Sequence, residues 1–426
     1  MANDYQSNIN KKLLKSFASG FESSTVLMNT VSKQLVNDFD PSTGRDDGQV
    51  SMKRPPQYVP QRTTDGDMSS NQANPVRVGN VQASVSDYIT VYVENAQVEE
   101  ALEADQLDQL LKPIAEDMVV TAETELAEYM ASNASLISGD PDFALSKWSD
   151  IANAGALLKE IGAPTGKKYA AINSFDETTL ADLQTQLGTN PEVTKAWDQA
   201  VVKRNFAGFS DVMTTNNLPE YTAGTETTGL TLGATPSALY ETYKNTYKMS
   251  IVITGATPTT GTLLKGQTLA IPASNLINMR NRKVIRKAGN PVVFTCTVLA
   301  DATADGSGNM TVAVAGAAIF ETGVNGAFNT VDRAITSGDA VTVLDGTAGQ
   351  IIRPALAYCE GFVGMGSVVL PKLHATDSMI MNHKNVSIRV HKFSDGVANK
   401  NRYRFDLLPT FATFNPAWGM KMHGVS

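Results

Sequence analysis

A long polar segment between residues 41 and 80 constrains the fold of this chain more than any other feature. Its middle is broken by prolines and carries charges such as those of Asp65-Gly66-Asp67, so it has too little apolar surface to offset the entropy lost on ordering. Apolar residues alternate on both sides of it, at Val50 and Met52 and again over residues 89–93, which predicts a two-stranded arm. Because such an arm is marginally stable alone in water, we expect it to find its missing contacts on neighbouring copies of the chain.

The overall composition excludes several classes of function. With 426 residues, 42% of them hydrophobic, the chain can bury a large core, and two or three domains are expected. A net charge of −8 argues against a dedicated nucleic-acid-binding protein, although an acidic wall can enclose DNA because it does not grip it. Cys296 and Cys359 are the only cysteines, which excludes a disulfide framework and favours folding in a reducing cytoplasm. The sequence has neither a secretory-signal pattern nor an apolar run of the ~20 residues that span a bilayer, so we expect no membrane association.

Two segments have the spacing of amphipathic helices. Residues 8–37 carry apolar residues in two stripes separated by Gly20, which predicts a helical arm. From residue 98 the spacing becomes helical, and apolar residues at spacings of three and four up to about 133 predict a long helix. Pro113 is expected in the first turn of this main helix, where it ends a shorter helix before it. The face opposite the apolar stripe is acidic and comprises Glu116, Asp117, Glu123, Glu125 and Glu128.

The second half of the chain changes character at about residue 222. Before this point, residues 140–221 have an α/β pattern, with helices expected at 149–161, 176–187 and 196–201 and a strand at 169–172. From 224 to about 351 the chain is rich in Thr, Gly, Ala and Val, and turn signals separate short alternating runs at 250–254, 292–298, 310–314 and 340–344. This pattern predicts a small β-barrel or sandwich, inserted into a host domain that strands near 386–393, 403–407 and 410–414 complete.

The candidate catalytic and metal-binding motifs lack the residue spacing that such sites require. The segment from Gly162 to Lys168 has three residues between its glycines instead of four and lacks a Ser or Thr after the lysine, so a helix-to-strand turn is favoured over a phosphate loop. Ser367 lacks the second glycine of a hydrolase elbow. The histidines, which lack the spacing of metal ligands, are His374, His383, His391 and His423. The sequence therefore predicts no catalytic residue, no cofactor and no metal.

Two charged segments are candidates for contacts between subunits. The polar arm carries both positive and negative charges. These charges could form ion pairs between subunits, each contributing only ~0–1 kcal/mol when exposed, or they could belong to a flexible tip that is merely soluble. The basic run at 279–287 is either a solvated loop of the barrel or an electrostatic contact to an acidic patch of an adjacent subunit, and nucleic-acid binding ranks below both because no aromatic residues interleave the charges. The candidates are Lys53, Arg54, Arg62, Asp65, Asp67, Arg280, Arg282, Lys283, Arg286 and Lys287.

Four features follow one another along the chain in an order that resembles a known family. They are the helical arm, the extended loop at 45–92, the acidic-faced helix with its Leu-Leu-Lys-Pro start, and a closing run that includes Ser387-Ile-Arg-Val-His-Lys-Phe-Ser-Asp-Gly and Arg404-Phe-Asp-Leu-Leu-Pro. Together they resemble the major capsid (coat) proteins of short-tailed double-stranded-DNA bacteriophages, in the subgroup whose subunit carries an inserted β-barrel. The resemblance covers nearly the whole chain and is weakest inside the barrel segment.

The resemblance implies the tailed-phage capsid fold, an α+β fold with an inserted small β-barrel domain. Its parts would be an N-terminal helical arm (1–44), an E-loop (45–93), a P-domain with the long spine helix (94–139, with further strands near 384–410), an A-domain (140–222), the barrel (223–351) and the closing strands (352–426).

The resemblance also implies partners and a location. The chain would form hexamers and pentamers of an icosahedral shell, assembled in the host bacterial cytoplasm as a procapsid with scaffolding protein and a portal protein. The shell would expand as it encloses double-stranded DNA without sequence-specific binding, and the chain would end in the virion. If the spine helix lined the interior, Glu116 and Glu123 would face the DNA and repel it, which would help spooling and ejection.

Two alternatives belong to other classes of protein. A cell-surface or tail-associated adhesion module is suggested by the Thr/Gly-rich segment, but the long helices outside it disfavour this interpretation. A metabolic α/β enzyme with a β insertion is disfavoured by the missing catalytic constellation.

Overall fold

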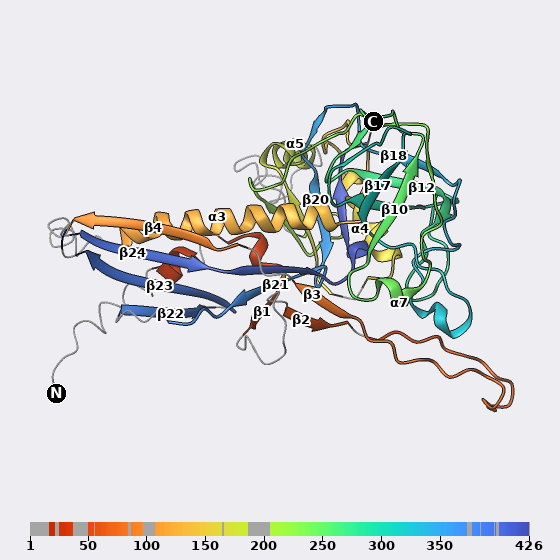
Figure 1. The fold of residues 1–426 in the computed structure, drawn as a ribbon, viewed down its shortest axis with the longest axis horizontal. Helices are drawn as coiled ribbons and strands as arrows, with labels where there is room; N and C mark the ends of the chain where they lie inside the picture. The colour runs from red at the N-terminus through yellow and green to blue at the C-terminus, as the bar shows by residue number, and fades with distance from the viewer. Residues whose placement is uncertain are drawn as a thin grey trace. The chain divides into compact units, whose positions relative to one another are not determined.

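The fold was obtained as a computed structural model, and Figure 1 traces it. The structure describes residues 17–21, 25–36, 50–54, 56–83, 87–96, 107–163, 166–185, 205–372, 377–383, 385–395, 397 and 400–425. The chain forms two compact units. Unit 1 comprises Met1–Ser51, Gln82–Ala127 and Val363–Ala412, and unit 2 comprises Met52–Val81, Glu128–Phe362 and Thr413–Ser426.

Unit 1 contains an antiparallel sheet of four strands, which lie side by side in Figure 1 in the order β22-β23-β24-β4. Their bounds are β22 Asp377–His383, β23 Val386–Asp395, β24 Lys400–Leu407 and β4 Ile89–Ala96. A second sheet has the order β1-β21-β25, with β1 Ser32–Val36, β21 Val363–Val368 and β25 Pro409–Thr413. The strands expected near the C-terminus are thus present, and β23 and β24 are antiparallel as predicted.

The prediction of a helix throughout residues 8–37 is wrong for its second half. Residues 17–21 are helical, but Leu27–Asn29 form the 3₁₀ turn η1, and β1 follows. Strand β1 pairs in parallel with β21, from Ser32 opposite Gly364 to Val36 opposite Val368. Backbone pairing with a distant strand therefore outweighs the helical spacing of the apolar residues, because local propensity is only a weak preference.

The long helix α3 spans Leu107–Asn133, and residues 97–106, where the helical spacing was predicted to start, lie outside the described part of the chain. Its apolar stripe is buried as expected, at Leu111, Met118, Ala122 and Leu126 among others. Pro113 lies inside the helix rather than in its first turn, so the prediction that a shorter helix ends before it is wrong. The proline costs one backbone hydrogen bond, and the buried stripe on both sides of it compensates for that loss.

The predicted pairing of the polar arm is also wrong. Strand β2 (Val50–Lys53) pairs with β3 (Asn80–Ala83), whereas residues 89–93 belong to β4 and pair with β24. The β4–β24 ladder runs from Ile89 opposite Leu407 to Ala96 opposite Lys400. It buries both Ile89 and Leu407, which a pairing confined to the exposed arm would leave in water.

Unit 2 contains a mixed sheet of five strands in the order β5-β26-β20-β6-β7. Helix α4 (Trp148–Glu160) packs on this sheet through Ile151, Ala154 and Leu158. This helix, strand β6 and helix α5 (Ser174–Thr185) match the predicted elements within two residues, and the helix predicted at 196–201 lies outside the described residues. The strands are β5 Leu136–Ser138, β6 Lys168–Ile172, β7 Asp211–Thr214, β20 Ala355–Cys359 and β26 Gly419–Met422.

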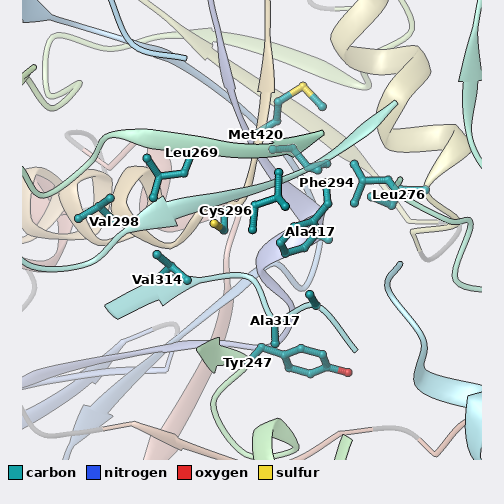
Figure 2. Packing of buried hydrophobic residues seen from close by; sticks show 14 of the residues in the cluster. Tyr247, Leu269, Leu276, Phe294, Cys296, Val298, Val314, Ala317, Ala417 and Met420 are labelled. Atoms are coloured by element: carbon teal, nitrogen blue, oxygen red, sulfur yellow. The ribbon is translucent and has the colours of Figure 1, made fainter. Parts of the chain in front are cut away.

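The predicted β-barrel is present in unit 2. Six strands close on themselves in the order β10-β17-β15-β12-β18-β9, so the barrel leaves no unpaired edge strand. Figure 2 shows part of its core, and Leu269, Phe294, Cys296, Val298 and Val314 belong to one hydrophobic cluster with Ala417 and with Met420 of β26. The barrel strands are β9 Leu230–Leu232, β10 Lys248–Thr254, β12 Thr268–Asn275, β15 Val293–Val298, β17 Met310–Ala315 and β18 Ala340–Val343.

The barrel lies between β7 and β20 in the sequence, so the five-stranded sheet is built from chain on both sides of it. The short strands β8 (Tyr221–Thr222) and β19 (Ile351–Ile352) pair where the barrel segment starts and ends. No described helix combines the length and apolarity that crossing a membrane would require.

Candidate assembly surfaces

The segment between β2 and β3, residues 54–79, is here called the extended loop, and it belongs to unit 2. Its described residues contain no strand, and side chains hold its two halves together. The amide of Asn74 bonds the backbone of Val59 in both directions, at 2.9 Å each, and Gln61 donates to the carbonyl oxygen of Gln72 at 2.6 Å. Asparagine and glutamine thus replace the backbone ladder that a hairpin would have.

The root of the extended loop is fixed by Arg54. This side chain is 6% exposed and donates to the carbonyl oxygens of Lys244 and of Thr413, the latter at 3.1 Å. Its guanidinium lies 4.3 Å from the ring centroid of Tyr247, a cation–π contact. Burial lowers the pKa of Arg54. The expectation that Arg54 contacts a neighbouring subunit is therefore corrected, because its side chain is buried and its Nη1 and Nη2 groups both donate within its own chain.

Two further arginines join the extended loop to the barrel region. Arg77 pairs with Glu321 at 2.9 Å and donates to the side-chain oxygen of Asn325 at 3.0 Å. Arg282, in the basic run, donates to the carbonyl oxygens of Tyr58 at 3.1 Å and Gly326 at 3.3 Å. Arg282 is only partly exposed, so most of its hydrogen-bonding capacity is also used within the chain.

The tip of the extended loop, residues 61–73, carries the remaining candidates of that segment. Arg62, Asp65 and Asp67 are exposed there. Asp65 accepts a hydrogen bond from the backbone of Asp67 at 3.0 Å, and Asp67 accepts one from the backbone of Ser69 at 2.8 Å. This backbone hydrogen bond lowers the pKa of Asp67, so its carboxylate remains charged at neutral pH. The side chain of Lys53 lies outside the described part of the chain.

The basic run forms a turn and a small hairpin on the barrel. Strands β13 (Arg286–Lys287) and β14 (Asn290–Pro291) pair across a two-residue turn, in which Ala288 and Gly289 both have positive φ. Arg280, Lys283, Arg286 and Lys287 are exposed. The hairpin therefore presents a group of positive charges to solvent, whereas Arg282 turns inward.

The acidic face of α3 is less uniform than its sequence suggests. Glu116 is partly exposed and lies 3.8 Å from Lys112. Glu123, in contrast, is 1% exposed and accepts hydrogen bonds from the backbone N–H groups of Val26 at 2.5 Å and Met28 at 3.2 Å. The prediction that Glu123 faces DNA is therefore wrong, because its carboxylate satisfies the N-terminal end of the η1 turn.

A buried polar cluster lies where the barrel meets the five-stranded sheet, and sequence reasoning missed it. Lys421 is fully buried, donates to the carbonyl oxygen of Gly266 and lies 5.0 Å from the ring centroid of Tyr221. Tyr221 in turn donates to Asp345 at 2.6 Å, and Asp345 also accepts from the backbone of Thr268. Burial lowers the pKa of Lys421 to about 8 and raises that of Asp345. Nothing in the local spacing marks these residues, since they are far apart in sequence.

The described residues contain no group of His, Cys, Asp and Glu side chains that could hold a metal ion. Cys296 and Cys359 are both buried free thiols. Burial raises their pKa values, to about 12 and about 11, so neither thiol is poised to act as a nucleophile.

Comparison with known proteins gives a match along the whole chain. The model of the family described as P22 coat protein, gene protein 5, matches residues 1–424. The major capsid protein of Acyrthosiphon pisum secondary endosymbiont phage 1 is 38% identical over 427 aligned residues, and the alignment covers 100% of each chain.

Solved structures that resemble this chain are distant in sequence. The capsid structure of the cyanophage P-SCSP1u has a TM-score of 0.45 at 9% identity, with 94% of this chain and 88% of that chain covered. The capsid of Ralstonia phage GP4 has a TM-score of 0.42 at 7% identity, with 92% and 87% covered.

Proposed function

Because the chain belongs to the P22 coat protein family, it is a major capsid protein of a bacteriophage, and we propose that its copies tile an icosahedral shell as hexamers and pentamers. It is a structural component of the virion and not an enzyme. The observation that carries this conclusion is the family match over residues 1–424, joined to 38% identity across a full-length capsid protein.

The proposal extends to how the chain is divided. An N-terminal arm (1–44), an E-loop (45–93), a P-domain around α3 (94–139) and an A-domain (140–222 and 352–426) would make up the shell-forming body, and the barrel at 223–351 would be an insertion. The pairing of β8 with β19 supports these boundaries of the insertion, because it brings together the two ends of the barrel segment, near residues 222 and 351.

Contacts between copies are assigned to the exposed charges. The loop tip offers Asp65 and Asp67, and the basic hairpin offers Arg286 and Lys287, with Arg62, Arg280 and Lys283 as further candidates. Opposite charges on two protruding segments suit weak contacts that can be corrected during assembly, since each exposed pair contributes only ~0–1 kcal/mol. The double substitution Lys283→Glu and Lys287→Glu should slow assembly at low salt and matter less at high salt, whereas equal assembly at both salt concentrations would remove this assignment.

The partners follow from the same proposal. A procapsid would form with scaffolding protein and a portal protein in the host bacterial cytoplasm, and it would expand while it encloses double-stranded DNA. Three acids of α3, the partly exposed Glu116 and the exposed Asp117 and Glu128, would line the interior and repel the DNA. Their joint replacement by lysine should impair packaging or ejection. The conservative change Glu123→Gln is the matched control, since this carboxylate is buried.

The assembly proposal is tested on the purified chain mixed with its scaffolding protein. Sedimentation and negative-stain microscopy should detect closed shells tens of nanometres across. A chain that stays monomeric and binds glycans would support the alternative of an adhesion module instead.

A further inference from the structure

Contacts within the extended loop contribute little to its stability. Its described part has no strand between Arg54 and Gly79, and its tip is exposed to water. One backbone hydrogen bond, from Arg54 N–H to the carbonyl oxygen of Gly79 at 2.9 Å, closes its root, and beyond the root side-chain amides bond its two halves. An isolated segment of this kind would lose more in conformational entropy than it gains in contacts, so something outside it has to hold it in shape.

The outgoing half of the loop is held at two points. At the root, Arg54 is buried against Tyr247 and bonds the carbonyl oxygens of Lys244 and Thr413. Further along, Arg282 reaches from the barrel to the carbonyl oxygen of Tyr58. The neighbouring Val59 packs against the hydrophobic core that the barrel contributes to.

The returning half is held separately. Arg77 forms its ion pair with Glu321 and bonds Asn325, so both acceptors come from the segment around η4 (Gly323–Phe328) of the barrel region. Gly79 passes so close to the carbonyl oxygen of Lys244 that no side chain fits there. The next residue, Asn80, donates its backbone N–H to the side chain of Asn245 at 3.1 Å.

We propose that the barrel braces the extended loop: Arg54, Arg77 and Arg282 hold both of its halves to the barrel in the unassembled subunit, and only the tip is left for a second copy of the chain. The barrel thereby has a role in assembly, because it orders the loop before association and so reduces the entropy lost when subunits join. Charge-assisted hydrogen bonds to carbonyl and carboxylate oxygens suit this role, since they fix direction as well as distance. The benefit to assembly rests on the proposed capsid function, but the bracing itself does not.

Hydrogen exchange on the unassembled full-length chain tests the brace directly. The variant Arg77→Ala with Arg282→Ala should make the backbone amides of residues 56–79 exchange at least ten-fold faster, while the amides of the barrel strands keep their protection. Arg62→Ala is the matched control, because it removes an exposed arginine of the same loop and should leave exchange unchanged. Unchanged exchange of the loop in the double variant would overturn the proposal.

A second variant keeps the test decisive if the double substitution disturbs folding. Glu321→Gln removes the charge that Arg77 faces but keeps an acceptor oxygen, so it should give a smaller acceleration, confined to the returning half of the loop. Equal acceleration along both halves and the barrel would also contradict the brace, since it would indicate general destabilisation. Because exchange is measured before assembly, the two failures are distinguishable. A failed brace gives unchanged loop exchange in the double variant although the wild-type chain forms shells. A failed capsid function gives faster loop exchange in the double variant although the wild-type chain forms no shells.

Discussion

The buried histidine after β26 should make the stability of unit 2 sensitive to mild acid. His423 is 4% exposed, and within the described part of the chain its Nε2 atom has no hydrogen-bond partner. Burial, together with the smaller effect of the nearby charge of Lys421, lowers its pKa to about 3. The folded chain therefore keeps this imidazole neutral, whereas the unfolded chain protonates it near pH 6.5.

The sign and size of the effect follow from that difference. Between pH 6.5 and about 3 the unfolded state binds a proton that the folded state does not, so the free energy of unfolding falls as the pH falls. Each pH unit in this window is equivalent to about 1.4 kcal/mol, so the loss between pH 7.5 and pH 5 is about 2 kcal/mol. The substitution His423→Gln should remove this contribution and leave the other titrating groups in place.

Urea unfolding of wild type and His423→Gln at pH 7.5 and pH 5, followed by fluorescence and circular dichroism, measures the effect. The wild-type chain should lose about 2 kcal/mol relative to the variant when the pH is lowered. The comparison at pH 7.5 is the internal control, because the imidazole is neutral there in both states. Parallel pH dependence of the two proteins would refute the reasoning, since it would mean that His423 is protonated equally easily in the folded state.

Three further predictions concern packing and hydrogen bonding. Glu123→Ala should cost roughly 1–3 kcal/mol, because it leaves buried backbone N–H groups without an acceptor, whereas Glu123→Gln should cost less; calorimetry distinguishes them. Phe17→Ala should lower the free energy of unfolding in urea by roughly 3–5 kcal/mol, since this fully buried ring stacks on Phe405 with centroids 4.9 Å apart. The control Phe175→Ala, at an 81% exposed position, should change the free energy of unfolding by less than about 0.5 kcal/mol. Gly79→Ala should loosen the root of the extended loop, detected as faster proteolysis between residues 56 and 79, because an added Cβ would overlap a backbone oxygen of the barrel.

The sequence predicted the barrel well where strands alternate between buried and exposed positions. Strands β10 and β17 have that pattern, with every second residue buried, and both were expected. Strand β12 was missed because its first four residues are all buried and Pro272 interrupts the run, so it has no period of two. The three-residue strand β9 is too short for any periodic signal.

Pairing between distant segments was the main source of error. The sequence does contain the helical spacing around Val31 and the alternation at 89–93. The strands that pair with these two segments, β21 and β24, however lie more than 300 residues away in sequence. Local propensity cannot identify such partners, because the free energy comes from burial and backbone pairing that only the folded chain provides.

The candidate surfaces were predicted in part. The loop tip and the basic hairpin are exposed, as contacts between subunits require. Arg54 and Glu123 are not, because each is buried against backbone partners from distant parts of the chain. Charge alone does not reveal burial, and a charged residue that satisfies backbone groups looks in sequence like one that faces water.

A cryo-microscopy map of the assembled particle tests the central claim most directly, because it resolves the extended loop in the presence of neighbouring copies. We predict that the tip, with Asp65 and Asp67, lies within ion-pair distance of basic residues of another copy, while Arg54, Arg77 and Arg282 still hold the loop to its own barrel. A tip that lies in solvent or folds back onto its own chain, in a particle that is otherwise closed, would contradict the account.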